Sequence, residues 1–336
     1  MPKKRLYEIN YPFVSFILPM KNEEKHVAKV IESILNLNYP KNLYEILVID
    51  DGSMDASVKI AQQYGVIIIQ ARDKTIAQLR NIGARESKGE LYAFVDTDCV
   101  LHQEWLKIGV FYLKDPKTGI VGNKTITDNS NWYLKTISFI RDQDEEVATG
   151  SWIPTASFIV KKTIFNQING FKDNLVTGED VDFGYRAKKY CQILLVGQMK
   201  SVHLGEDKNL IELFNKEIWR GSSNINSIKT HGIVKEEIPS LLVPVYGLLL
   251  GIGLCSVVIK SFFLMKIDSV IILLLLLFTF PACLYSLWLS LKKQNFRYFL
   301  NIIVVRLVYQ IGRSIGLVKE IGEEMGTKGH KRATKE

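Results

Sequence analysis

Two long stretches without a charged residue constrain this chain more than any other feature. They cover residues 238–259 and 269–291, and each exceeds the ~20 helical residues that span a ~30 Å hydrocarbon core. A pair of buried helices in a water-soluble core is the alternative, but such helices rarely stay uncharged on every face for so long. With the short connection 260–268, the two stretches predict a helical hairpin that crosses a membrane twice.

The residues around this hairpin predict its orientation. Lys292, Lys293 and Arg297 follow the second apolar stretch, as the positive-inside rule requires of a cytoplasmic flank. The start, residues 1–11, is polar and lacks the apolar core of a signal peptide. We therefore expect a multi-pass protein of the cell membrane whose N-terminal domain lies on the cytoplasmic face.

A third apolar segment, residues 296–318, differs from the first two because it contains polar residues. Arg306, Gln310 and Arg313 are spaced four and three apart, which places them on one helical face. A spanning helix would bury two arginines at depth. An interfacial helix lying in the headgroups is therefore favoured over a third span, and a basic tail follows it.

The net charge of +8 is compatible with two kinds of partner, nucleic acid or an anionic membrane surface. The basic residues are spread along the chain, and two of their three local concentrations lie beside or beyond the apolar segments. This distribution favours the membrane and predicts no nucleic-acid partner. The four scattered cysteines argue against a disulfide scaffold and against a cysteine-based zinc site.

The N-terminal part alternates short apolar runs with amphipathic stretches. Strands are expected at residues 13–18, 45–49, 66–70 and 91–95, and helices at 23–36, 55–65 and 75–87. This alternation predicts an α/β domain in which helices cover a mainly parallel sheet. Polar loops follow the C-terminal ends of these strands, where open α/β sheets bind ligands.

Asp96 and Asp98 follow the apolar strand 91–95 directly. Alternate residues that leave a strand point the same way, so both carboxylates can face one ion. Hard oxygen ligands of this kind suit Mg²⁺ or Mn²⁺. An acidic turn that only starts the next helix is the alternative.

Acidic residues also follow other predicted elements. Asp50 and Asp51 end the second strand, and Gly52 permits a turn. A carboxylate there can accept a hydrogen bond from a nucleotide base or a ribose hydroxyl. Glu179 and Asp180 precede an apparent helix, where they can supply a general base or simply complement the helix dipole.

These acidic residues belong to a series of segments in a fixed order. The segments are SFILPMKNEE, EILVIDDGSMD, RNIGARESKGE, LYAFVDTDCV and TGEDVDFGYR. Their order and wording closely resemble family 2 glycosyltransferases, which have the GT-A fold, over roughly residues 14–220. The resemblance implies a GT-A nucleotide-sugar-binding domain, which we place at 1–235. The apolar segments predict that a membrane anchor follows at 236–336, with spans at about 238–260 and 268–291.

The resemblance also assigns roles to the acidic residues. It implies that Asp98 is a direct metal ligand, with Asp96 nearer the ribose and a metal-bound water. Asp51 would bind the nucleotide base. Asp180 would be the catalytic base, with Glu179 beside it on the substrate. His203 would complete the metal shell or contact the diphosphate, although a purely structural histidine is the alternative.

Other expected substrate-binding residues are Pro19, Asn22, Glu23 and Arg80. By analogy the first three close the nucleotide pocket, and Asn22 can also cap the following helix. Arg80 would pair with the diphosphate or the base, unless it is a surface residue of its helix. Trp219 and Arg220 resemble only loosely the Gln-x-x-Arg-Trp segment of processive synthases, because their order is reversed and Lys216 replaces the glutamine. This departure argues against processive synthesis.

The predicted function is an inverting transfer from a nucleotide-diphosphate sugar to a hydroxyl of a lipid-linked glycan or polysaccharide precursor. A UDP-sugar is favoured as donor, and a GDP-sugar is the alternative. A polyprenyl (dolichyl) phosphate acceptor would already be an anion and need no base, so the intact Gly178-Glu179-Asp180 motif favours a hydroxyl. A non-catalytic nucleotide-binding membrane protein could lose Asp98 or Asp180, and this chain has both.

Overall fold

The computed structural model describes residues 11–123, 125–127, 130–141, 146–154, 156–175, 178–222, 238–263 and 269–333. It divides into two compact units, Met1–Asp128 with Arg141–Glu206, and Asn129–Ile140 with Asp207–Glu336. The domain boundary expected near residue 235 lies outside the described residues and stays a prediction. The connection 260–268 and the basic tail are only partly described.

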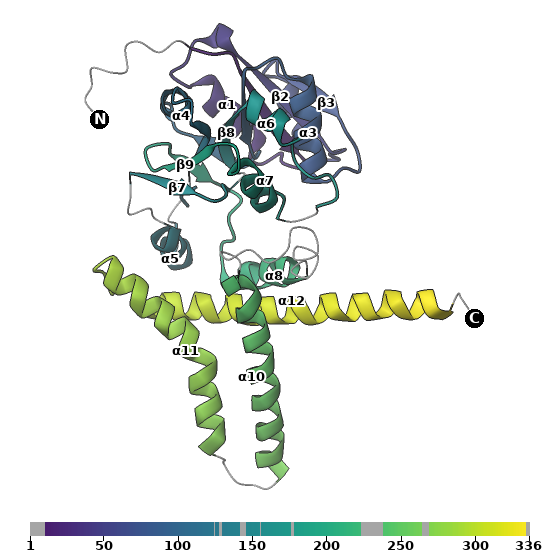
Figure 1. Ribbon diagram of the computed structural model, residues 1–336, viewed down its shortest axis with the longest axis vertical. Helices are drawn as coiled ribbons and strands as arrows, with labels where there is room; N and C mark the ends of the chain where they lie inside the picture. The colour runs from purple at the N-terminus through teal and green to yellow at the C-terminus, as the bar shows by residue number, and fades with distance from the viewer. Residues whose placement is uncertain are drawn as a thin grey trace. The chain divides into compact units, whose positions relative to one another are not determined.

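The first unit contains a mixed sheet of eight strands in the order β3-β2-β1-β4-β8-β6-β9-β7 (Figure 1). The strands β3, β2, β1 and β4 pair in parallel, whereas β8 is antiparallel to both β4 and β6. The expected α/β fold with a mainly parallel sheet is therefore confirmed. The strand bounds are β1 Val14–Met20, β2 Tyr44–Asp50, β3 Ile67–Gln70, β4 Leu91–Val95, β6 Thr118–Gly122, β7 Val147–Gly150, β8 Ser157–Lys161 and β9 Gln192–Val196.

Helices cover both faces of this sheet, which explains why β1 is buried along its whole length. Successive side chains point to opposite faces, so Phe16 and Leu18 join one apolar cluster and Ile17 the other. The first cluster includes side chains of α1 (Val27–Leu35), α2 (Ser57–Gln62) and α4 (Trp105–Leu113). The second includes those of α3 (Ile76–Glu86), α6 (Lys162–Gln167) and α7 (Glu179–Ala187).

The helix α1 begins later than the sequence suggests. Its N-cap is His26, so the expectation that Asn22 caps this helix is wrong. Asn22 instead has a positive φ of 54°, and its Oδ1 accepts a hydrogen bond from the Met54 backbone at 2.9 Å. This hydrogen bond holds the Asn22 side chain at the loop after β2, so the side chain does not cap α1.

The second unit is helical. It contains α5 (Trp132–Arg141), α8 (Leu210–Gly221), α10 (Ile238–Phe263), α11 (Ser269–Lys292) and α12 (Phe299–Ala333). The last three are long and apolar enough to cross a membrane. In this unit α10 and α11 pack against each other, as the expected hairpin requires, and α12 lies across them (Figure 1).

The polar face expected on α12 packs against neighbouring helices of this unit. Arg313 donates to Glu217 of α8 at 2.6 Å, and Glu217 is itself 1% exposed. Gln310 is 2% exposed and donates to the Phe278 carbonyl of α11. Arg306 lies over the ring of Tyr285, 3.6 Å from its centroid. These polar groups find partners on neighbouring helices, so they do not form an outward-facing stripe.

Candidate active site

The site lies at the carboxyl ends of β1, β2 and β4 in the first unit. Met20 and Asp50, the last residues of β1 and β2, pair in register, so the loops that follow leave from the same edge. β4 ends at Val95 beside them, and Asp96 follows. The parallel arrangement thus gathers loops that are remote in sequence, as expected for a ligand site of an open α/β sheet.

Asp51 is 7% exposed and held by two donors. Lys21 Nζ lies 2.6 Å from its Oδ2, and the Lys74 backbone N–H donates to its Oδ1 at 3.0 Å. Burial raises the pKa of Asp51, but these hydrogen bonds outweigh it and lower the pKa below its ordinary value. Asp51 is therefore ionised at neutral pH. The sequence does not predict this contact of Lys21, although Lys21 lies within the segment SFILPMKNEE.

Pro19, Asn22 and Glu23 come together with the neighbouring loops. The Thr97 hydroxyl donates to the Pro19 carbonyl at 3.2 Å, which joins the end of β1 to the loop after β4. The Glu23 backbone N–H donates to Ser57 Oγ at 2.7 Å, while its carboxylate lies 3.0 Å from His26. The backbone contacts fix the shape of this edge. The Glu23 side chain is engaged locally.

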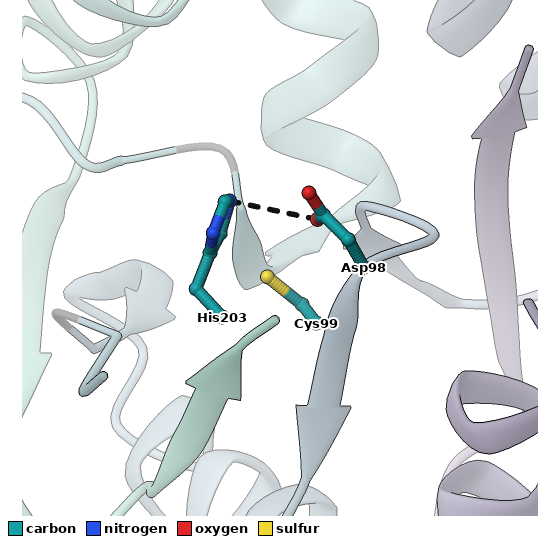
Figure 2. Close-up of side chains that lie close together, drawn as sticks. All are labelled: Asp98, Cys99 and His203. Atoms are coloured by element: carbon teal, nitrogen blue, oxygen red, sulfur yellow. Dashed lines mark ion pairs between the residues drawn. The ribbon is translucent and has the colours of Figure 1, made fainter. Parts of the chain in front are cut away.

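The candidate metal ligands Asp98 and His203 face each other (Figure 2). Asp98 follows β4, and His203 ends β10 (Ser201–His203), which pairs with β5 (Cys99–Leu101) so that His203 lies opposite Cys99. Nε2 of His203 lies 3.5 Å from Oδ1 of Asp98. Each of the three side chains offers one ligand atom within 4.8 Å of the others.

These residues fit a divalent cation. Oδ1 of Asp98, which faces Nε2 of His203, is buried without a hydrogen-bond partner. An unsatisfied buried acceptor costs free energy unless a ligand satisfies it. Burial, assisted by Asp96 and Asp98, raises the pKa of the Cys99 thiol well above its ordinary value, so Cys99 is a neutral neighbour. The scattered positions of the cysteines in the sequence do not predict that Cys99 lies next to Asp98 and His203.

Arg80 is 2% exposed, so the alternative that it is a surface residue of α3 is wrong. Its Nη2 lies 2.9 Å from Asp96 Oδ1, and its Nη1 lies 2.8 Å from Glu179 Oε1. One arginine therefore joins two acidic motifs from different parts of the chain.

Asp180 lies in the first turn of α7, next to Glu179. The turn begins at Gly178, whose φ of 75° is accessible to glycine without strain. Thr177, which opens this motif, lies outside the described residues. Burial and the adjacent Glu179 raise the pKa of Asp180 to about 7. A carboxyl group with this pKa can take up and release a proton near neutral pH.

Trp219 and Arg220 belong to the second unit. Both lie on α8, where Trp219 is 52% exposed and Arg220 donates to Glu217 at 2.7 Å. Their expected contact with substrate stays a prediction.

Acidic loops at one edge of a mainly parallel sheet are the arrangement expected of proteins with the GT-A fold. A solved structure supports this class. The mannosyltransferase PcManGT from Pyrobaculum calidifontis, in complex with GDP-Man and Mn²⁺, superposes with a TM-score of 0.60 over 91% of this chain and 87% of its own. The two are 14% identical, so the likeness shows a shared fold.

Sequence comparison identifies the family. Residues 15–173 match the model of the family described as Glycosyl transferase family 2. Over these residues the match confirms the resemblance to family 2 glycosyltransferases that the motifs predict.

Two curated relatives are similar over about half of this chain. Glycosyltransferase AglE of Haloferax volcanii is 31% identical over 186 residues, which cover 52% of this chain and 61% of AglE. The second relative, from Methanococcus voltae, is a dolichyl N-acetyl-α-D-glucosaminyl phosphate 3-β-D-2,3-diacetamido-2,3-dideoxy-β-D-glucuronosyltransferase. It is 21% identical over 192 residues, which cover 51% of this chain and 60% of the relative. The chain therefore spans less than two thirds of either relative.

Proposed function

We propose that this protein is a membrane-anchored, inverting glycosyltransferase. It transfers a sugar from a nucleotide-diphosphate sugar to a hydroxyl of a lipid-linked glycan or polysaccharide precursor. The observation that carries the proposal is the bridge from Asp96 through Arg80 to Glu179. It brings a motif suited to the donor and a motif suited to acceptor activation into one site.

On the donor side, Asp51 is an ionised acceptor for a base N–H or a ribose hydroxyl. Asp98 and His203 would hold a divalent cation, Mg²⁺ or Mn²⁺, with Asp96 close by. When bound, the cation supplies Lewis-acid stabilisation of the charge on the departing nucleotide diphosphate. PcManGT, which shares this fold, was solved in complex with GDP-Man and Mn²⁺, and this complex supports the same chemistry here. We favour a UDP-sugar, with a GDP-sugar as the alternative.

On the acceptor side, Asp180 takes the proton of the attacking hydroxyl as the new glycosidic bond forms. A pKa of about 7 suits this role, because a general base works best when its pKa is near the operating pH. The Methanococcus voltae relative, whose name specifies a dolichyl-phosphate-linked sugar, supports a lipid-linked acceptor. A polyprenyl phosphate acceptor is the alternative.

The C-terminal helices would place the protein at the cytoplasmic face. α10 and α11 are the two spans, and the basic residues after α11 favour the cytoplasmic side. α12 carries an exposed apolar stripe on one helical face, which would lie in the membrane surface. The stripe consists of Leu300, Val304, Ile311, Ile315 and Val318. A third span is the alternative.

A thermal-shift screen of the full chain in detergent tests the donor site. UDP-, GDP- and dTDP-sugars would each be added with Mn²⁺, Mg²⁺ or EDTA. At a donor concentration of about 100 Kd, binding should stabilise the fold by about 2.7 kcal/mol. We expect one nucleotide class to raise Tm only when metal is present, and the Asp98→Asn variant to lose this response. If no donor raises Tm under any condition, the proposed donor site is wrong.

A further inference from the structure

Arg80 has an arrangement that neither a donor-binding arginine nor a surface arginine requires. It lies in α3 with its side chain 2% exposed. Its two terminal nitrogens are both engaged, at 2.9 Å from Asp96 and 2.8 Å from Glu179. Two of the five N–H donors of the guanidinium, one on each terminal nitrogen, are therefore committed to carboxylates of the chain itself.

The guanidinium is also fixed from one side by aromatic packing. Its Cζ lies 5.4 Å from the ring centroid of Phe171, over the ring. Phe171 stacks on Phe183 of α7 at 4.3 Å and meets Phe94 of β4 edge-on at 5.4 Å. The aromatic cluster beside Arg80 therefore includes a side chain of α7, which carries Glu179, and one of β4, which Asp96 follows.

The chemistry of the group suits a bridge between two carboxylates. A guanidinium is planar and presents its donors in a fixed fork, whereas the ammonium of lysine is a compact point charge on a flexible stem. A buried charge must be paired to be tolerated, and here two carboxylates pair it. Asp96 precedes the metal-ligand candidate Asp98 by two residues, and Glu179 is adjacent to Asp180.

We propose that Arg80 is a positioning residue that sets the distance between the donor and metal motif, Asp96–Asp98, and the acceptor motif, Glu179–Asp180. It contacts no reacting atom and acts through its two carboxylate partners. The proposal rests on the proposed function. Displacement of a reacting group by about 1 Å can cost about a hundredfold in rate, so holding this distance has a large effect on turnover.

The test is Arg80→Lys, which keeps the charge but loses the fork. Two quantities are measured on the full chain in detergent. These are the affinity for UDP or GDP with Mn²⁺, by calorimetry, and the rate at which nucleoside diphosphate is released from the donor selected in the thermal-shift screen. We expect turnover to fall about 10- to 100-fold while nucleotide affinity changes less than about threefold. Arg85→Lys, an exposed site on the same helix, is the matched control and should change neither.

A double-mutant cycle with Asp180→Asn separates positioning from a general loss of packing. If Arg80 acts by placing Asp180, Arg80→Lys should have little further effect on turnover once the base is gone. Additive losses would overturn the proposal. A loss of affinity for UDP but not for uridine would also overturn it, because Arg80 would then bind the diphosphate directly.

Three further outcomes are distinguishable. If Arg80→Lys does not fold, Glu179→Gln removes one charged arm while Asp96 stays paired, and it should give the same pattern of lost turnover and retained nucleotide affinity. If Asp180→Asn alone leaves turnover unchanged, the proposed function fails, and the role of Arg80 fails with it. If Asp180→Asn is inactive but Glu179→Gln and Arg80→Lys turn over normally, only the role of Arg80 fails.

Discussion

Replacing Asp180 with asparagine removes one proton acceptor and leaves the size of the side chain unchanged. General-base catalysis typically contributes ~10²–10⁴-fold, so we expect the turnover number to fall by that factor, or roughly 3–5 kcal/mol in activation free energy. Donor affinity should change little. Asp51, Asp98 and His203, which are expected to hold the donor and its metal, are all untouched.

The pH dependence of turnover gives a second signature. The base must be deprotonated to act, and burial beside Glu179 raises the pKa of Asp180 to about 7. Wild-type turnover should therefore fall about tenfold per pH unit below about pH 7 and level off above it. The residual activity of Asp180→Asn should lack this acid limb.

The assay combines release of nucleoside diphosphate with calorimetry of donor binding, using acceptors extracted from membranes. Asp115→Asn is a suitable control. Asp115 is exposed at the end of α4, and its Oδ1 accepts from the Lys117 backbone, which asparagine can also do. This variant should retain turnover and its pH dependence.

Two results would refute parts of this reasoning. If Asp180→Asn loses donor binding together with turnover, Asp180 belongs to the nucleotide or metal site. If turnover falls far less than ~10²-fold with binding intact, the nucleophile is already ionised, as a polyprenyl phosphate would be.

Further predictions concern the metal, the nucleotide, the tail and the helix packing. Asp98→Asn should abolish transfer and weaken nucleotide-diphosphate binding in Mn²⁺ without unfolding the protein, and near-normal turnover in EDTA would exclude the metal role. Asp51→Asn should weaken nucleoside binding measured by calorimetry, by about tenfold for the loss of one charge-assisted hydrogen bond. An epitope tag after Glu336 should resist protease added to intact cells, since digestion would mean that α12 spans. Gly221→Val should lower Tm, because a Cβ there would lie 2.7 Å from the Arg313 carbonyl of α12, whereas Gly322→Val, with open space around it, should not.

The strands and helices of the first half of the sheet can be predicted from local sequence patterns. The apolar run that forms β1 and the alternation of strands and helices up to β4 are visible in sequence because burial on both faces demands them. The acidic motifs could be placed at strand ends because they directly follow the apolar runs in the sequence. The structure then brings Asp98 and His203 together through the pairing of β5 with β10.

The partners of individual side chains were harder to predict because they are remote in sequence. Arg80 and Glu179 are 99 positions apart, and no periodicity in either segment indicates that they pair. The same limit applies to Arg313, whose partner Glu217 lies on another helix. The sequence alone predicts donor binding for Arg80 and an interfacial helix for Arg313, and both stay predictions. Their protein partners add contacts that the sequence does not reveal.

Metal-dependent sugar transfer can be followed with a labelled sugar. The full chain in detergent would be incubated with a donor labelled in its sugar, Mn²⁺ and a lipid extract of membranes. We predict that label enters a lipid-extractable product in proportion to the nucleoside diphosphate released, and that EDTA and Asp98→Asn both prevent it. If the chain binds the donor with metal but transfers no label from any UDP- or GDP-sugar, it is a nucleotide-binding membrane protein without this activity.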